Sequence, residues 1–281
     1  MTEAGTIGLF IIIANVFLSY RAFNNFAMYQ GMAFKVDPIL IGKDYKRIIT
    51  SGFVHVSWMH LIFNMLSFFF FSARLEAATG SGNFLLIYFG SLIGGNLLAL
   101  YIHRNHGDYA AVGASGAVSG VIFSAIALFP GMELGLLFLP IFIPSWAFGL
   151  LFVAYSVMGI KSQSDNIGHE AHLGGGLVGL LITIGLYPEA IRFNPWPILA
   201  IVVPSLIFFY IILAHPNWLI INKTPGGRTK YVSVDDKFNI VKKEKEEDID
   251  RILDKISQKG IDSLTQKEKQ ILERYSGKKG D

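Results

Sequence analysis

Long apolar stretches recur through the first 214 residues of this chain, and they restrict it to a fold built within a membrane. A helix needs roughly 20 mostly apolar residues to cross a bilayer. Charged residues make up only 16% of the chain, against about 25% in soluble domains, and they concentrate after residue 221. We therefore expect an all-α polytopic membrane protein with a soluble tail. Seven stretches could form spans: 6–28, 56–73, 83–102, 113–130, 134–158, 168–187 and 196–214.

Differences in hydropathy, proline content and charge divide the chain into three parts. We expect a membrane core over 1–194, a seventh membrane helix within the proline-rich segment 195–221, and a charged soluble tail over 222–281. Pro140 and Pro144 predict that the fifth span starts late or is kinked, because proline disrupts a helix interior. In the tail, apolar periodicity predicts a helix over 244–259. The capping-box spacing of Thr265 and Glu268 predicts the start of a second helix, which completes a small helical hairpin.

The composition of the chain excludes several kinds of functional site. The chain has no cysteine, which excludes disulfides, thiolate nucleophiles and cysteine metal sites. A net charge of +3 gives little support for nucleic-acid binding, so we expect no nucleic-acid partner.

Polar residues within three apolar stretches form the main candidate site. Ionisable groups at membrane depth are costly and usually functional. Ser115 lies in a Gly-Ala-Ser-Gly sequence, and His172 lies in a different stretch. A serine hydroxyl becomes a nucleophile when a base takes its proton, and a histidine suits that task. His60 and Asn64, four residues apart on one helix face, could donate hydrogen bonds to a developing oxyanion. His55 lies five residues before His60.

The sequence His169-Glu170-Ala171-His172 suggests a metal site, but its spacing does not fit one well. The zinc motif H-E-x-x-H places its histidines four apart, whereas these are three apart. A metal site of another kind stays open as a minor alternative. We expect His169 to make polar contacts near the start of its helix, and Glu170 to be solvated or interfacial.

Glycines line the two helices that carry Ser115 and His172. Gly116 and Gly120 have the four-residue spacing that allows close helix packing, and Gly175 and Gly179 repeat it in the other helix. Close contact there would bring the two side chains together. For the glycines taken alone, helix packing without catalysis is the favoured explanation.

Three motifs resemble those of rhomboid intramembrane serine proteases. Residues 55–65 resemble the family's second transmembrane helix, residues 113–116 its G-x-S-G nucleophile motif, and residues 171–175 its catalytic histidine segment. Glu76 followed by Gly80 is similar to the acidic residue and glycine after that second helix. The order and spacing of the motifs also agree, and the resemblance covers about residues 45–190.

The resemblance implies a rhomboid-like six-helix bundle that cleaves transmembrane protein substrates without a cofactor or metal. It implies Ser115 as nucleophile, His172 as base, and His60 and Asn64 as the oxyanion hole, with His55 in a more structural role. One departure stands out: Ser119 occupies a position where many members carry an aromatic residue against which the histidine packs. The family pattern therefore names no residue that orients His172 here.

Two other functions compete with the protease. A catalytically silent rhomboid-like protein that binds transmembrane clients would usually lack the serine or the histidine, and both are present. A transporter is disfavoured because no internal repeat of the broken-helix kind is evident. We expect a multi-pass protein of the cell membrane, in contact with the lipid bilayer. The sequence does not indicate the oligomeric state.

Two arguments disagree on the side of the membrane where the loop before the second span lies. Lysines and arginines before the second span place that loop in the cytoplasm by the positive-inside rule. The family orientation places it outside, and we follow the family orientation for the site.

Overall fold

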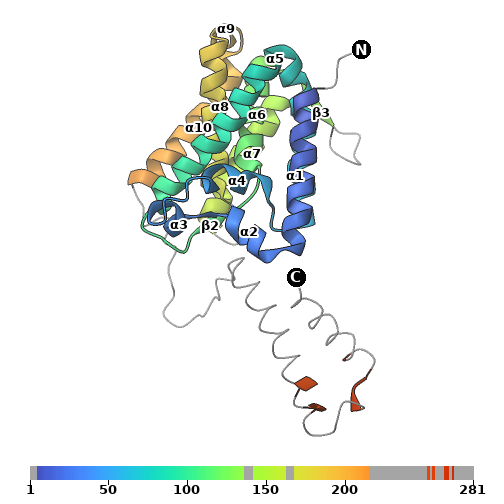
Figure 1. Ribbon diagram of the computed structural model, residues 1–281. Helices are drawn as coiled ribbons and strands as arrows, with labels where there is room; N and C mark the ends of the chain where they lie inside the picture. Colours follow the sequence, from blue (N-terminus) through green and yellow to red (C-terminus); the bar gives the residue numbers. More distant parts are fainter. Residues whose placement is uncertain are drawn as a thin grey trace. The chain divides into compact units, whose positions relative to one another are not determined.

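The computed structural model describes residues 5–135, 142–162 and 168–214, together with 252–253, 255–256, 263–265 and 268. The chain separates into two compact units, Met1–Thr224 and Pro225–Asp281. The first unit is a bundle of helices (Figure 1). The expected boundaries at 194 and 221 within the membrane part stay predictions.

The helices of the bundle follow the apolar stretches closely. In chain order they are α1 (Thr6–Asn24), α2 (Phe26–Met32), α3 (Val36–Leu40), α4 (Arg47–Thr50), α5 (Trp58–His103), α6 (Ser115–Leu128), α7 (Ser145–Ser162), α8 (His169–Leu186), α9 (Glu189–Phe193) and α10 (Pro195–Ala214). A 3-10 turn, η1 (Ser51–Phe53), precedes α5. Two small antiparallel sheets pair β1 (Phe34–Lys35) with β2 (Ala110–Ala111), and β3 (Glu133–Gly135) with β4 (Phe142–Pro144).

Three expected boundaries need correction. The first stretch ends at Asn24 rather than at residue 28, because Asn25 is extended and caps α2 through its side chain. The second and third stretches form one helix with a kink at Gly80, whose φ of 75° suits glycine. The fifth helix begins at Ser145 and not at residue 134, which confirms the late start; residues 142–144 before it are the strand β4.

Length and composition support membrane spans for part of the bundle only. Among the described residues, two helices, α1 and α5, are long and apolar enough to cross a membrane, while α6, α7 and α10 contain shorter apolar runs. Each half of α5 on either side of Gly80 is longer than the roughly 20 residues that a span requires. The number of spans therefore stays a prediction.

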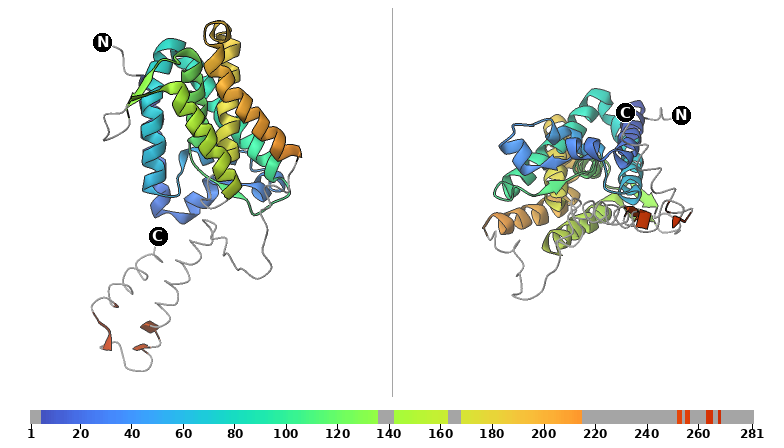
Figure 2. Two further views of the ribbon diagram at one scale, coloured as in Figure 1. Left: turned by 180° about the vertical axis from the view of Figure 1, so that it is seen from behind. Right: turned by 60° about the horizontal axis from the view of Figure 1, so that its bottom comes forward.

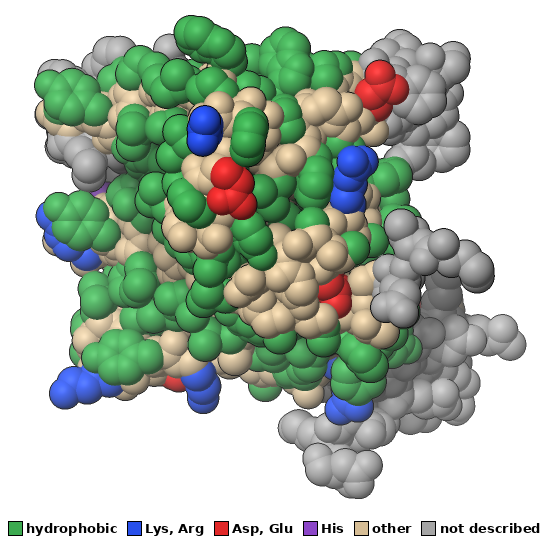
Figure 3. Space-filling model, turned by 90° about the horizontal axis from the view of Figure 1, so that it is seen from above, with side chains coloured by type: hydrophobic (Ala, Val, Ile, Leu, Met, Phe, Trp, Pro, Cys, Tyr) green, Lys and Arg blue, Asp and Glu red, His purple; other side chains and the backbone are tan. Residues whose placement is uncertain are grey.

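Parts of the surface of the bundle are covered by large apolar side chains, which a soluble protein would bury in its core. Large apolar side chains such as Phe10, Phe63 and Phe193 are exposed. Hydrophobic side chains make up much of the end face drawn in Figure 3, and charged side chains on it are few and scattered. Exposed apolar area of this extent is typical of a surface covered by lipid or by another protein.

The helix α6 lies at the centre of the bundle. Every residue from Gly116 to Ala127 is buried, and a helix that is apolar all round belongs in a core. It packs mainly against α5 and α8, while α1 and α10 lie on opposite sides of the bundle (Figures 1 and 2). The start of α6, which carries Ser115, is thus held by neighbouring helices.

A carboxylate fixes the start of α1. Glu76 is buried, and its two oxygens accept the backbone N–H groups of Ile7 at 3.1 Å and Gly8 at 2.9 Å. Negative charge at a helix N-terminus is stabilising. The carboxylate also accepts the hydroxyl of Ser81 at 2.9 Å, just beyond the kink.

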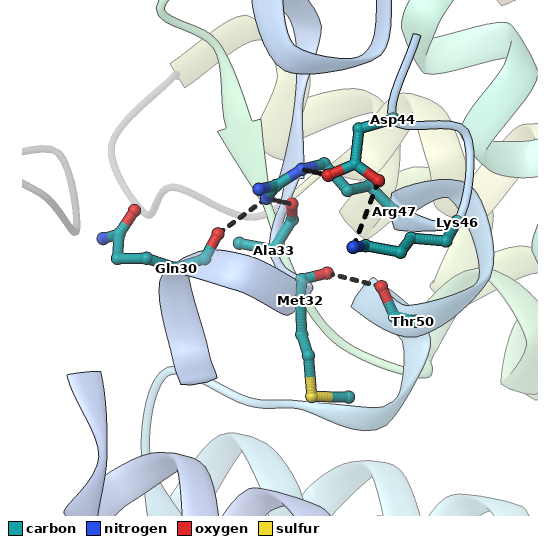
Figure 4. Close-up of polar contacts among 7 residues, drawn as sticks. All are labelled: Gln30, Met32, Ala33, Asp44, Lys46, Arg47 and Thr50. Carbon is teal, nitrogen blue, oxygen red and sulfur yellow. Dashed lines mark hydrogen bonds and ion pairs between the residues drawn. The ribbon is translucent and has the colours of Figure 1, made fainter. Parts of the chain in front are cut away.

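The connection from α2 to α5 is folded around Arg47 (Figure 4). Its guanidinium donates to the carbonyls of Gln30 at 2.6 Å and Ala33 at 2.8 Å, and to the carboxylate of Asp44 at 2.9 Å. Thr50 adds a hydrogen bond to the carbonyl of Met32 at 3.0 Å. This network fixes the segment that leads directly into η1.

The described residues of the second unit include the expected capping box. The backbone N–H of Thr265 donates to Glu268 at 2.7 Å, and the N–H of Glu268 contacts the Thr265 hydroxyl at 3.4 Å, as predicted. Hydrogen bonding from Lys255, followed by that from Thr265, lowers the pKa of the Glu268 carboxyl to about 2. The expected helix bounds at 244–259 lie largely outside the described residues.

Candidate active site

Ser115 is the first residue of α6, and the turn before it requires glycine. Gly113 has a φ of 125°, a conformation that other residues rarely adopt. Its N–H donates to the carbonyl of Ser51 in η1 at 2.9 Å. The connection between α2 and α5, which Arg47 holds together, therefore supports this turn. A Cβ at Gly113 would also lie 2.7 Å from the His60 ring. Both constraints explain the first glycine of the Gly-Ala-Ser-Gly sequence.

His60 lies beside the nucleophile turn. The position of a hypothetical Cβ on Gly113 is 3.0 Å from His60 Nε2 and 3.7 Å from Ser115 Oγ. The imidazole and the hydroxyl therefore border the same small space. His60 Nδ1 has no hydrogen-bond partner among the residues that the structure describes. Buried polar side-chain atoms usually have a hydrogen-bond partner, so this nitrogen is an exception.

Asn64 lies one turn further along α5, as its spacing from His60 predicted. Its side chain is buried and its Nδ2 donates to the His60 carbonyl at 3.0 Å. An amide nitrogen carries two hydrogens, so one donor remains after this bond. The bond fixes Asn64 relative to the helix turn that carries His60.

His55 connects the nucleophile turn to α1. Its Nδ1 is 2.9 Å from the Ser19 hydroxyl, and its Nε2 is 3.4 Å from the backbone nitrogen of Ala114. The ring is fully buried and makes an edge contact with His60 at a centroid distance of 5.0 Å. His55 therefore lies behind the site, where it links α1 to the residue preceding Ser115.

The start of α8, which carries His172, lies against the start of α6 because the two helices approach through their glycines. A Cβ on Gly116 would lie 3.2 Å from the Ala171 carbonyl oxygen, and one on Gly175 would lie 2.7 Å from the Gly116 carbonyl carbon. One turn on, a Cβ on Gly179 would lie 2.5 Å from the Gly120 Cα. The expected seam is confirmed, and Ser115 and His172 are the residues that flank its first contact.

The structure records no hydrogen bond between Ser115 and His172. Neither ring nitrogen of His172 has a hydrogen-bond partner among the described residues, although the side chain is buried. Catalytic hydrogen bonds are often long before substrate binds. The ring instead contacts aromatic neighbours: Phe152 on α7 at 5.8 Å with an interplanar angle of 27°, and His169 at 5.3 Å.

The residues at the start of α8 differ in part from expectation. His169 is the first residue of the helix, nearly fully buried, with an edge contact to Tyr155 at 5.2 Å. Glu170 is not solvated: it is 7% exposed and lies 3.0 Å from His103 Nε2, at the end of α5. Sequence reasoning missed His103, which stacks on Tyr109 at 3.7 Å. Among the described residues no cluster of three His, Cys, Asp or Glu side chains is placed to bind a metal.

A small cavity of about 10 Å³ opens beside Ser115. Ser51, Asn96 and Gly168 line it together with the nucleophile turn. Its volume is close to that of one water molecule. Asn96 donates to the Ile48 carbonyl at 2.7 Å and to the Ser51 hydroxyl at 3.2 Å, which gives the cavity one polar wall.

The sequence matches known families in both parts of the chain. A model of the Rhomboid domain matches residues 42–189, and a model of a family of unknown function matches residues 232–278. The first match covers more than half of the chain and includes Ser115, His172, His60 and Asn64.

Curated relatives agree with the first match. The chain is 28% identical over 203 residues to the RHOMBOID-like protein 12, mitochondrial, of Arabidopsis thaliana, an alignment that covers 66% of this chain and 60% of that protein. It is 33% identical over 150 residues to the Rhomboid protein 1, mitochondrial, of Saccharomyces cerevisiae. That alignment covers 51% of this chain and 43% of the yeast protein. It is 34% identical over 142 residues to a putative rhomboid protease of Bacillus subtilis. That alignment covers 50% of this chain and 66% of the bacterial protein. The chain thus spans about half to two thirds of the length of these relatives.

Proposed function

This chain belongs to the rhomboid family, and we propose that it is an intramembrane serine endopeptidase that uses Ser115 as nucleophile and His172 as base. The observation that supports the proposal is the glycine contact between α6 and α8, in which Gly116, next to Ser115, faces Ala171, next to His172. Membership of the family does not by itself establish this activity, because a protein's function depends on the residues of its site.

The proposed reaction is a two-step acyl transfer. Ser115 Oγ attacks the carbonyl carbon of the scissile peptide bond while His172 accepts the hydroxyl proton. His172 then gives this proton to the leaving amine as the carbon–nitrogen bond breaks. A water molecule attacks the acyl-enzyme in the second step while His172 accepts its proton. His172 then returns this proton to Ser115 Oγ as the ester carbon–oxygen bond breaks, which regenerates the serine hydroxyl.

His60 and Asn64 are proposed to stabilise the oxyanion of both steps. The His60 ring borders the space next to Ser115 Oγ, and Asn64 retains one amide hydrogen after bonding to the His60 carbonyl. Removing one such donor typically costs about 10²–10³-fold in rate. No metal or cofactor takes part in the proposed reaction.

The substrates are proposed to be transmembrane proteins that reach the site within the lipid bilayer. We propose a multi-pass location with six core spans and a seventh formed by α10, and keep the cell membrane as the proposed compartment. Two of the relatives are named as mitochondrial. Fractionation of the source cell, with detection of the protein in either membrane, decides between the two compartments.

A covalent probe tests the proposal. Purified protein in detergent is treated with a fluorophosphonate, and the labelled peptide is sequenced. We expect labelling at Ser115, loss of labelling and of substrate cleavage in Ser115→Ala and His172→Ala, and a double variant no worse than either. Cleavage by Ser115→Ala at the wild-type rate would contradict the assignment. An unlabelled, inactive wild-type protein that still captures single-span membrane proteins would support the client-binding alternative instead.

A further inference from the structure

Among the described residues the ring of His172 has no polar anchor, so packing is what orients it there. Both ring nitrogens lack hydrogen-bond partners among the described residues. A base that accepts a proton from Ser115 nevertheless needs a defined ring plane, because a displacement of about 1 Å can cost on the order of 10²-fold in rate. A contact that fixes the ring plane is therefore a requirement of the proposed function.

Ser119 cannot supply this contact. It lies one turn after Ser115 on α6, and its hydroxyl donates to the Ser115 carbonyl at 2.6 Å. That bond turns the short side chain back onto its own helix. No ring contact between Ser119 and His172 is possible, since serine has no ring.

Phe152 supplies a flat surface from a different helix. Its ring lies 5.8 Å from the His172 ring, centroid to centroid, at 27°. This offset, near-parallel arrangement lies within the favourable range for aromatic pairs. We propose that Phe152, on α7, is the positioning residue that sets the orientation of the His172 imidazole. This inference rests on the proposed function.

Phe152 is itself held in place. It makes an edge contact with Phe123 at 6.2 Å and 85°, and Phe123 is fully buried on α6. Phe123 in turn packs on Gly176, where a Cβ would lie 2.7 Å from its ring. The rings of Phe123 and Phe152 thus form a continuous support from the glycine face of α8 back to His172.

The position of α7 is fixed by its first turn. The Ser145 backbone nitrogen donates to the Met132 carbonyl at 2.7 Å, and the Ser145 hydroxyl contacts the carbonyls of Phe129 at 3.0 Å and Pro130 at 3.1 Å. Further along, a Cβ on Gly149 would lie 2.7 Å from Ile126 of α6. The arrangement implies that any displacement of α7 changes the orientation of the base.

Substitutions at position 152 test the inference in the full chain. We expect Phe152→Ala to lower the second-order rate of fluorophosphonate labelling by on the order of 10²-fold. The loss should appear in the maximal labelling rate and not in the apparent affinity for the probe. Phe152→Tyr keeps the ring and should retain most of the wild-type rate. Phe152→Leu keeps apolar volume without a ring and should fall close to Phe152→Ala.

Phe148 provides the matched control on the same helix. It lies one turn before Phe152 and contacts Phe71 of α5 at 5.8 Å, away from His172. Phe148→Ala should lower thermal stability as Phe152→Ala does while it keeps a labelling rate near that of the wild type. Equal rates for Phe152→Leu and Phe152→Tyr, or an equal loss in Phe148→Ala, would overturn the inference. Absence of labelling in the wild-type protein would instead refute the proposed function.

Discussion

Glycine residues determine the distance between the helices that carry the proposed nucleophile and base. At Gly175 and Gly179 the facing backbone of α6 occupies the space in which a side chain would begin. Backbone atoms cannot rotate away as a side-chain tip can. A single methyl group at these positions must therefore separate α6 from α8.

The substitution Gly175→Ala tests this seam at the residue scale. The added methyl would meet the backbone of Gly116, directly after Ser115. We expect a stability loss of about 1–3 kcal/mol, typical of overpacking, and a drop in Ser115 labelling of on the order of 10²-fold. Thermal unfolding in detergent and the labelling rate measure the two effects.

The control for this prediction is Gly185→Ala in the same helix. Among the described residues no atom outside the local helix backbone lies within 4 Å of a Cβ at Gly185, so a methyl group has room there. This variant should match the wild-type protein in both measurements. If Gly175→Ala were also indistinguishable from wild type, the close approach of α6 and α8 would be wrong.

At the scale of elements, the first turn of α8 is tied to the end of α5. Glu170 and His103 form a pair with side chains 9% and 15% exposed. Glu170 lies two residues before His172 in the chain, and His103 stacks on Tyr109 in the segment that leads to Ser115. One contact thus connects the segments on both sides of the proposed dyad.

A double-mutant cycle on this pair tests its contribution. We expect Glu170→Ala and His103→Ala each to destabilise the protein by about 1–3 kcal/mol, because each leaves a buried polar partner unsatisfied. The double variant should lose less than the sum of the two. Thermal unfolding in detergent provides the free energies.

Glu189→Ala serves as the comparison, since Glu189 is an exposed residue on α9. It should change stability by less than about 0.5 kcal/mol. Strict additivity of the Glu170 and His103 substitutions would show that the contact carries no coupling energy.

At the scale of the whole molecule, the orientation in the membrane follows from which end of the bundle faces outward. The loop before α4 and the helix α9 lie at opposite ends of the bundle (Figure 1). Tyr45 is 58% exposed in that loop. The chain has no cysteine, so single cysteines introduced at either end have no background.

We expect a cysteine at Tyr45 to react with a membrane-impermeant maleimide added to bacterial spheroplasts that express the protein. A cysteine at Glu189 should react only after the membrane is opened with detergent. The reverse pattern would contradict the family orientation and agree with the positive-inside rule. Labelling of both positions in sealed spheroplasts would contradict the bundle as a spanning unit.

Much of the architecture was predictable because its signals are local. The apolar stretches placed most helices, since the length and hydropathy of a segment are properties of the segment itself. The capping box at Thr265 depends on four consecutive residues, and it formed as expected. The ends of α1 and the start of α7 were less predictable because they depend on single turns and on strand pairing.

The sequence by itself determined the family of the chain, the position of most of its apolar helices, and the residue types of the candidate site. Only the tertiary structure decided which groups meet. Glu170 was expected to be solvated or interfacial, whereas it is buried beside His103, which lies 67 residues away in the chain. Phe152 gave no signal, because an aromatic residue in an apolar helix resembles any lipid-facing or core residue. Contacts of this kind depend on how helices pack across long separations in the chain, and no local pattern encodes that.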